Sequence, residues 1–262
     1  MTYKFIAALT TVILAILSST THAANWSKTQ LHINRGVFDH PFTKQKAMND
    51  IISLQHASTN NYGDVFFFVD YLDDDYVDGF NDKDFYSEGY ATFSGKALFD
   101  WQYNFWRLQD VGFVIGYNAA GDAKMLKYLP GIKLSWDIPG FDFLTTTATA
   151  YFDDSAGIGQ GGAPQTNNTF MLDLAWGYPY SLGSQKFYFT GHAEYIGSRR
   201  NEVGRYVNDW ILAQMAFQWD LGHAIATTSN TLMLGVEWQV WRNKMGTSHN
   251  ESATQLHIVW TF

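Results

Sequence analysis

Cysteine is absent from the 262-residue chain, so no disulfide framework can hold its fold together. Charged residues make up only 16% of it, whereas a soluble domain usually approaches about a quarter. Only five prolines are present and no Ser/Pro-rich linker follows the N-terminal segment, so we expect no internal domain boundary. The formal net charge of −8 argues against a nucleic acid polymer as partner, because phosphates demand a basic surface.

The N-terminal segment has the pattern of a secretory signal peptide. A short leader ending at Lys4 precedes an apolar stretch from Phe5 to Leu17, and small residues follow up to Ala23 and Ala24. The alternative is a membrane-spanning helix, but the stretch is shorter than the roughly 20 apolar residues that a span needs. We predict a signal peptide at 1–23, cleaved after Ala23 or Ala24, and one domain at 24–262. No later segment is apolar for long enough to span a membrane as a helix.

Aromatic residues are abundant, at 17% of the chain, while the mean hydropathy is −0.19. This combination suits a transmembrane barrel with a lipid-facing apolar band, aromatic girdles and a polar interior. Polar and apolar residues also alternate with period two, which is typical of β-strands with two different faces. Twelve such segments occur, at 26–37, 49–58, 63–72, 86–97, 110–118, 125–136, 141–153, 167–178, 186–197, 207–219, 231–242 and 252–262.

The predicted fold is all-β, a transmembrane antiparallel up-and-down β-barrel of about twelve strands in the bacterial outer membrane. An even count puts both termini on the periplasmic side, and segments near ten residues match a tilted crossing. The last segment is the clearest, with Leu256, Ile258 and Trp260 on one face and Gln255 and His257 on the other. A soluble sandwich is the alternative, since its strands show the same alternation.

Turn composition supports the order of the strands. The connections at 137–140 and 178–183 are short, as periplasmic turns should be, and longer polar stretches at 73–85, 153–166, 198–206 and 243–251 are predicted external loops. Asp73–Asp75 could attract calcium, but we interpret the run as a solvated loop. We predict no metal site, because the histidines lack a metal-binding spacing such as His-Glu-x-x-His.

Several segments resemble a known family. Ile51–Ala57, Tyr62–Asp70, Ser87–Ser94, Trp136–Phe141 and Trp176–Phe187 are similar to the Tsx/OmpK-like nucleoside-specific outer-membrane channels, and the likeness runs along nearly all of the mature chain. The Tyr-Gly-Asp-x-Phe-Phe-Phe-Val-Asp block at 62–70 is the most specific piece. The resemblance implies a monomeric twelve-stranded barrel with a narrow pore for nucleosides and deoxynucleosides. The family's acidic residue in the second strand is Gln55 here, and its Pro-Arg after the Glu88 region is Ala91-Thr92.

The segment at 63–72 indicates what faces the pore. Asp64 and Asp70 share a face, and a charge in lipid costs a few kcal/mol near the midplane, so this face should look into the lumen. Phe66 and Phe68 then look inward too, where an aromatic ring can stack on a base. By parity and by the resemblance, the predicted solute-binding residues are Gln55, Asp64, Phe66, Phe68, Asp70, Glu88, Tyr90, Asp173, Glu194 and Glu237, with Gln214 and Gln239 as further lumen candidates.

Other interpretations of these residues remain open. The lumen carboxylates could pair with Lys96, Lys127 or Lys133, and the phenylalanines could be interior packing. The barrel could have no transport role and serve as a structural or surface-interaction protein whose external loops phages or bacteriocins contact. An outer-membrane enzyme acting on lipid is a third class. We expect no enzyme and no cofactor, because Ser94 and Ser181 lack a nucleophile motif and His56, His192 and His257 lie on different strands.

The functional prediction is an outer-membrane channel for passive diffusion of nucleosides or similar small solutes. An acidic pore should repel nucleotides, whose phosphates are anionic. Binding in the pore must stay weak, because a channel needs its solute to leave.

Overall fold

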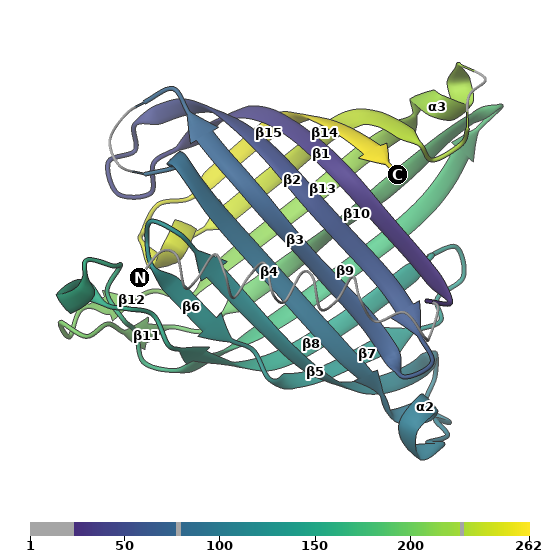
Figure 1. The fold of residues 1–262 in the computed structure, drawn as a ribbon, viewed down its shortest axis with the longest axis horizontal. Helices are drawn as coiled ribbons and strands as arrows, with labels where there is room; N and C mark the ends of the chain where they lie inside the picture. Colours follow the sequence, from purple (N-terminus) through teal and green to yellow (C-terminus); the bar gives the residue numbers. More distant parts are fainter. Residues whose placement is uncertain (1–23, 77–79, 226–227) are drawn as a thin grey trace.

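The computed structural model describes residues 24–76, 80–225 and 228–262. The predicted signal peptide at 1–23 lies outside the described residues. The described chain forms one antiparallel sheet whose long, tilted strands wrap round a central axis (Figure 1). The strands are β1 (Trp26–Asp39), β2 (Lys46–Asn60), β3 (Gly63–Asp74), β4 (Asp82–Ser94), β5 (Leu108–Ala120), β6 (Met125–Tyr128), β7 (Gly131–Trp136), β8 (Phe143–Asp153), β9 (Thr169–Leu182), β10 (Gln185–Ile196), β13 (Trp210–Asp220), β14 (Leu232–Arg242) and β15 (Glu251–Thr261).

The sheet makes twelve crossings, because β6 and β7 form a single crossing that is interrupted at Leu129–Pro130. Proline has no backbone N–H to donate, so the ladder breaks at this position. The crossing keeps its place, since Leu129 exchanges backbone hydrogen bonds of 2.8 and 3.0 Å with Gly116, and the Pro130 carbonyl accepts one from Ala150 at 2.9 Å. The predicted twelve-stranded antiparallel barrel is confirmed.

Closure of the barrel is made by its first and last strands. β1 pairs with β15 from Gln30↔Thr261 to Gly36↔Gln255, so the sheet has no free edge there. In lipid, no water can satisfy an open edge, and closure is how a sheet meets that requirement. The single closed sheet also rules out the soluble sandwich, which needs two stacked sheets. No helix in the described part of the chain is long and apolar enough to cross a bilayer.

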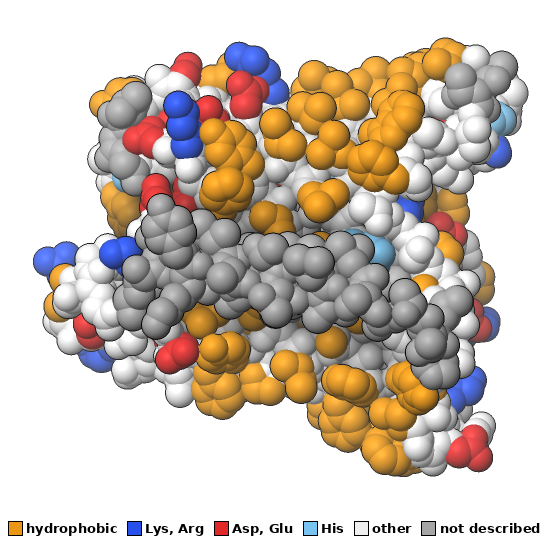
Figure 2. Space-filling model, viewed as in Figure 1, with side chains coloured by type: hydrophobic (Ala, Val, Ile, Leu, Met, Phe, Trp, Pro, Cys, Tyr) orange, Lys and Arg blue, Asp and Glu red, His pale blue; other side chains and the backbone are white. Residues whose placement is uncertain are grey.

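The outer face of the barrel is apolar. Figure 2 shows hydrophobic side chains across its middle, with charged side chains gathered toward the two ends. Alternate residues along the strands make up this band, and many of its large members are at least two-fifths exposed: Ile33, Ile52, Leu54, Phe93, Phe113, Ile115, Ile132, Phe152, Phe170, Leu172, Phe217, Val236, Trp238, Leu256 and Trp260. The residues between them point inward. Contact with acyl chains is the environment that such a surface requires.

The connections differ at the two ends. At the end where β1 begins and β15 finishes, β2–β3 and β9–β10 are joined by two-residue turns, and β7 and β8 by 137–142. The predicted long loops all lie at the opposite, external end, which also carries η1 (Ile158–Gln160), β11 (Arg199–Arg200), β12 (Tyr206–Val207) and η2 (Lys244–Gly246). Two other periplasmic connections are longer, as the gaps between the predicted segments at 98–109 and 220–230 indicate, and they carry short helices, α2 (Gly95–Phe99) and α3 (Leu221–Ala224).

The strand predicted at 86–97 is wrong in its last three residues. The chain leaves the sheet at Ser94, whose Oγ accepts a hydrogen bond from the Ala97 backbone at 3.0 Å and so caps α2. A serine at this position satisfies one of the free N–H groups of a helix start, which favours a helix over a continued strand.

Side chains lock the seam of the barrel at its external end. The buried Lys244 ammonium bonds to Glu251 Oε2 of β15 at 2.5 Å and to the Asp39 carbonyl of β1 at 2.6 Å. His249 Nε2 lies 3.0 Å from Asp39 Oδ2. The connection after β14 therefore holds the first and last strands together.

Candidate functional site

All ten predicted solute-binding residues lie on the lumen face of the barrel wall. The register places Asp64, Phe66, Phe68 and Asp70 of β3 beside inward-facing residues of β2 and β4. The outward neighbour Phe67 instead stacks on His56, with ring centroids 5.4 Å apart, and His56 bonds to the outward Thr29 at 2.9 Å. The alternation of residues along this strand therefore predicted correctly which side chains face the lumen and which face outward.

Phe68 occupies the centre of an aromatic and polar surface on β2–β4. Its cross-strand neighbours are Gln55 on one side and Glu88 on the other, so an amide and a carboxylate flank its ring. Phe66 meets Phe68 edge to face with ring centroids 6.1 Å apart, and Tyr86 lies 6.0 Å from Phe68. Three inward rings thus adjoin two groups that can exchange hydrogen bonds with a solute.

Neutral donors hold the carboxylate of Glu88. The hydroxyl of Tyr86 donates to Glu88 Oε1, and that of Tyr90 donates to Oε2 at 2.8 Å. The Tyr90 hydroxyl also lies 3.3 Å from Asn118 Oδ1. Its ring lies against Gly116, where an added Cβ would approach the ring to 2.4 Å, so only glycine leaves room for this arrangement. Two hydroxyl donors therefore fix the carboxylate of Glu88 in place.

A second polar chain crosses the opposite wall, from β9 to β15. His192 lies 3.0 Å from Asp173 Oδ2 and 2.9 Å from Gln214 Oε1. Gln214 donates to Glu237 Oε1 at 3.3 Å, and Gln255 donates to the same oxygen at 2.7 Å. These five residues form what we call the polar belt. Glu237 is only 9% exposed, and Glu88 and Glu194 are 8% and 7% exposed, so neighbouring side chains cover most of each carboxylate residue.

The belt continues to the seam of the barrel. His257 bonds to Gln218 at 2.8 Å through one ring nitrogen and to Asn34 of β1 at 2.7 Å through the other. Its Nδ1 also lies 3.7 Å from Glu237 Oε2. Further along β1, Gln30 accepts from Gln55 at 3.4 Å, which joins this wall to the surface round Phe68. Amides and carboxylates therefore line most of the circumference.

Two lumen acids are paired with lysine, as the packing alternative anticipated. Lys133 of β7 forms an ion pair with Asp64 at 2.5 Å, across the intervening strands β4 and β5. Lys127 pairs with the buried Asp153 at the external end. Lys96 lies in α2, outside the lumen, so it pairs with none of the lumen carboxylates. Asp70, in contrast, is hydrogen-bonded by the neutral Ser53.

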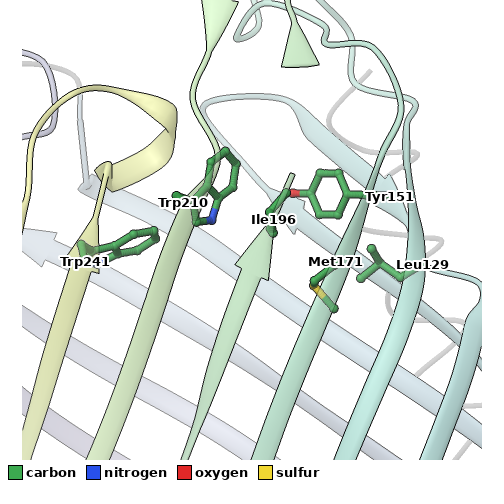
Figure 3. Close-up of a cluster of buried hydrophobic side chains, with 6 residues drawn as sticks. All are labelled: Leu129, Tyr151, Met171, Ile196, Trp210 and Trp241. Atoms are coloured by element: carbon green, nitrogen blue, oxygen red, sulfur yellow. The ribbon is translucent and has the colours of Figure 1, made fainter. Parts of the chain in front are cut away.

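The external end of the lumen holds a buried hydrophobic cluster. Six side chains from neighbouring crossings point inward there and lie close together (Figure 3): Leu129, Tyr151, Met171, Ile196, Trp210 and Trp241. Trp210 connects the cluster to the polar lumen, because its indole N–H donates to Glu194 Oε1 at 3.3 Å. The external mouth is therefore narrowed on this side by packed side chains.

Arg199, from the external connection between β10 and β13, covers this cluster. Its guanidinium carbon lies 4.2 Å from the Trp210 ring centroid and 5.4 Å from that of Tyr151. Hydrogen bonds to the Gly197 carbonyl at 3.1 Å and to Thr166 Oγ1 at 3.2 Å fix the side chain, which is 8% exposed. The guanidinium of Arg199 therefore lies at the external entrance of a lumen that is lined with carboxylates.

Sequence reasoning missed several residues of this site. Tyr86 and His192 could have been found by parity, because each shares a face with predicted residues. Arg199 belongs to a predicted loop and gave no periodic signal. The side chains offered as catalytic candidates do not converge: His56 faces outward, and Ser94 caps α2. Within the described part of the chain, no group of three or more His, Asp or Glu could hold a metal ion.

The fold is similar to that of known porins. A structure described as the KdgM porin aligns with a TM-score of 0.50 and 10% identity over 89% of this chain and 99% of that one. A structure of the NanC porin aligns with a TM-score of 0.50 and 13% identity over 89% and 98%. No family model matches the chain, and no curated protein matches it either. At this identity the likeness concerns the fold, which is that of a multi-pass bacterial outer-membrane barrel, as predicted.

Proposed function

We propose that the barrel is an outer-membrane channel for passive diffusion of nucleosides or similar small, uncharged solutes. The observation that carries the proposal is the position of Phe68 between Gln55 and Glu88 on the lumen wall, with Phe66 beside it. The resemblance to the Tsx/OmpK-like family stays a prediction and points to the same class of solute.

This surface offers both interactions that a nucleoside needs. An aromatic ring can stack on the base, which is worth roughly 1–3 kcal/mol in nucleic acid binders. The carboxylate of Glu88 and the amide of Gln55 can bond to ribose hydroxyls or base edges. Since both polar groups are already hydrogen-bonded within the wall, binding costs some of those bonds and stays weak, which suits a channel.

Charge defines which solutes pass. Asp70, Glu88, Glu194 and Glu237 are held mainly by hydroxyl, amide and indole donors, so the lumen wall keeps an excess of carboxylates. Anions, including nucleotides, meet repulsion that a low-dielectric wall strengthens. We infer a preference for neutral and cationic solutes over anionic ones.

The crowded lumen favours a second candidate, a barrel with no transport role. The burial of Glu88, Glu194 and Glu237, together with Arg199 over the external cluster, is also what a closed interior would show. Such a protein would act through its external loops, as a surface that phages or bacteriocins contact.

Planar-bilayer recording of the purified protein separates the two candidates. A channel shows discrete conductance steps that adenosine or thymidine blocks in a concentration-dependent way, and adenosine monophosphate blocks much less. A protein that inserts and folds but gives no conductance supports the second candidate. Light scattering of the detergent complex tests the proposed monomeric state.

A further inference from the structure

The connection between β4 and β5, residues 95–107, exposes large aromatic side chains at the periplasmic end of the barrel. Phe99 is 55% exposed, Phe105 65% and Trp106 77%. Leu98 and Trp101 are also exposed. In Figure 1 the connection projects from the barrel at α2, well away from the lumen. A cluster of this kind on a short connection requires an apolar or interfacial partner.

The cluster is continuous with the lipid-facing wall. Trp101 and Phe99 lie 5.9 and 6.3 Å from the outward ring of Phe113 on β5. Trp106 lies 6.0 Å from Trp136 of β7, whose indole donates to the outward Thr146 at 3.1 Å. Figure 2 shows the hydrophobic surface running from the barrel wall onto this projection. The connection therefore lies where the acyl chains end and the headgroups begin.

Its backbone is held firmly against the barrel. Asp110 Oδ1 accepts from the backbone N–H of Lys96 at 3.1 Å and of Val111 at 2.8 Å. Trp101 packs directly on Gly95, where an added Cβ would lie 2.3 Å from its ring. Trp106 has a φ of 38°, a left-handed conformation that a bulky residue rarely adopts. The backbone at Trp106 is therefore strained, and this strained conformation keeps its ring exposed.

A small cleft with two cations adjoins these aromatic rings. It has a volume of about 230 Å³, and its lining includes Lys96, Trp101, Tyr103, Arg107 and Asp137. Neither Lys96 nor Arg107 forms an ion pair with another described residue. Among the lining residues, these two cations outnumber the single carboxylate, that of Asp137. The carboxylates of Asp100 and Asp110 lie at the edge of the cleft, where they bond to Gln102 and Tyr103.

We propose that residues 95–107 anchor the barrel in the inner leaflet, and that the cleft binds the phosphate of an anionic phospholipid. Lys96 and Arg107 face the phosphate, while Trp101 and Trp106 lie among the first acyl carbons. Aromatic rings favour this depth, and a basic residue near an anionic membrane surface contributes about 1 kcal/mol. The site lies outside the lumen and does not depend on transport.

Native mass spectrometry of the purified barrel with phosphatidylglycerol tests the proposal. We expect wild-type protein to retain phosphatidylglycerol more strongly than phosphatidylcholine. Lys96→Gln with Arg107→Gln should weaken that retention by about 30-fold, since two cations are lost. The matched control is Lys44→Gln with Arg205→Gln, which removes two exposed cations from the external loops and should bind as wild type does. Equal retention in the Lys96/Arg107 variant and the wild type would overturn the site.

Two further measurements separate a lipid from other partners. Glycerol phosphate in solution should displace phosphatidylglycerol only weakly, and full displacement at comparable concentration would assign the cleft to a soluble phosphate instead. In vesicles that contain lipids brominated near the headgroup, tryptophan quenching should fall when Trp101 and Trp106 are both changed to Phe. Unchanged quenching would place the aromatic cluster in water and overturn the anchor.

Discussion

The guanidinium carbon of Arg199 lies 4.2 Å from the ring centroid of Trp210, at the external mouth of the lumen. Trp210 in turn donates its indole proton to Glu194. The external connection is thereby joined through one ring to the acidic lumen wall. A buried cation over an aromatic face is worth about 2 kcal/mol or more, enough to hold a loop segment in place.

Arg199→Ala should therefore loosen the external mouth and raise single-channel conductance. This change also removes a positive charge, so two control variants are needed. Arg199→Lys keeps the charge at the same position, and Arg200→Ala removes a charge from the adjacent position. Arg200 is its exposed neighbour, and its guanidinium donates to the Gly204 carbonyl at 3.0 Å, so its loss alters the local charge equally and leaves the cluster in place. We expect a higher single-channel conductance for Arg199→Ala than for Arg200→Ala. The conductance of Arg200→Ala should stay close to that of the wild type. Equal conductance in these two variants would show that charge, and not the packing of Arg199, acts at the mouth.

Phe66→Ala with Phe68→Ala should weaken nucleoside block by about tenfold or more, because an aromatic–base stack is worth roughly 1–3 kcal/mol. Phe67→Ala is the matched control, since its ring lies between them in sequence but faces outward against His56. Block is measured as the nucleoside concentration that halves the single-channel current. An unaltered half-blocking concentration in the double variant, with the barrel folded, would remove the stacking proposal.

The sequence predicted the crossings and their faces well, because each depends on a local pattern. A lipid-facing side chain must be apolar at every second position, so Leu256, Ile258 and Trp260 reveal their strand without tertiary information. Asp64 and Asp70 were enough to orient Phe66 and Phe68. The interruption at Pro130 fell inside one predicted segment, as the alternation continues across it.

Relations between distant strands were not predictable in this way. Lys133 reaches Asp64 over two intervening strands because closure of the barrel sets which residues share a height, and no single segment encodes that shear. The inward fold of Arg199 depends on the shape of a loop and not on periodicity. The aromatic connection at 95–107 was anticipated only as a gap, 98–109, between two predicted strands, because a helix of five residues such as α2 gives no periodic pattern of its own.

Neutralising two lumen acids should reduce the preference for cations. Glu194→Gln with Glu237→Gln keeps side-chain size while it removes two charges, so the ratio of cation to anion permeability should fall several-fold. Reversal potentials under a potassium chloride gradient measure that ratio. Asp122→Asn with Asp154→Asn, which removes two exposed charges from external connections, is the charge-matched control. The effect should shrink at 1 M salt, where the Debye length is about 3 Å instead of about 10 Å at 0.1 M. Unaltered selectivity would mean that these carboxylates do not face the permeating ions.

Lys244 should be essential to the external seam of the barrel. Burial lowers the pKa of its ammonium, and its partners Glu251 and Asp39 belong to the last and first strands. Removing one member of a buried pair leaves the other uncompensated, so Lys244→Ala should lower the free energy of unfolding by about 3–5 kcal/mol. Urea unfolding in detergent or lipid measures the change, followed by the shift between folded and unfolded mobility on gels.

The double variant Lys244→Met with Glu251→Met distinguishes a pair from a packing defect. Well-packed apolar residues often replace a buried ion pair without loss, so this variant should recover most of the stability that Lys244→Ala loses. Lys46→Ala is the control at the same end, because its exposed ammonium lies 3.8 Å from Asp39 Oδ1 and contributes at most about 1 kcal/mol. If the double variant is as unstable as Lys244→Ala, the ion pair is not the source of the loss. The seam is then held by the bonds to the Asp39 backbone, whose carbonyl accepts from Lys244 and whose N–H donates to Glu251.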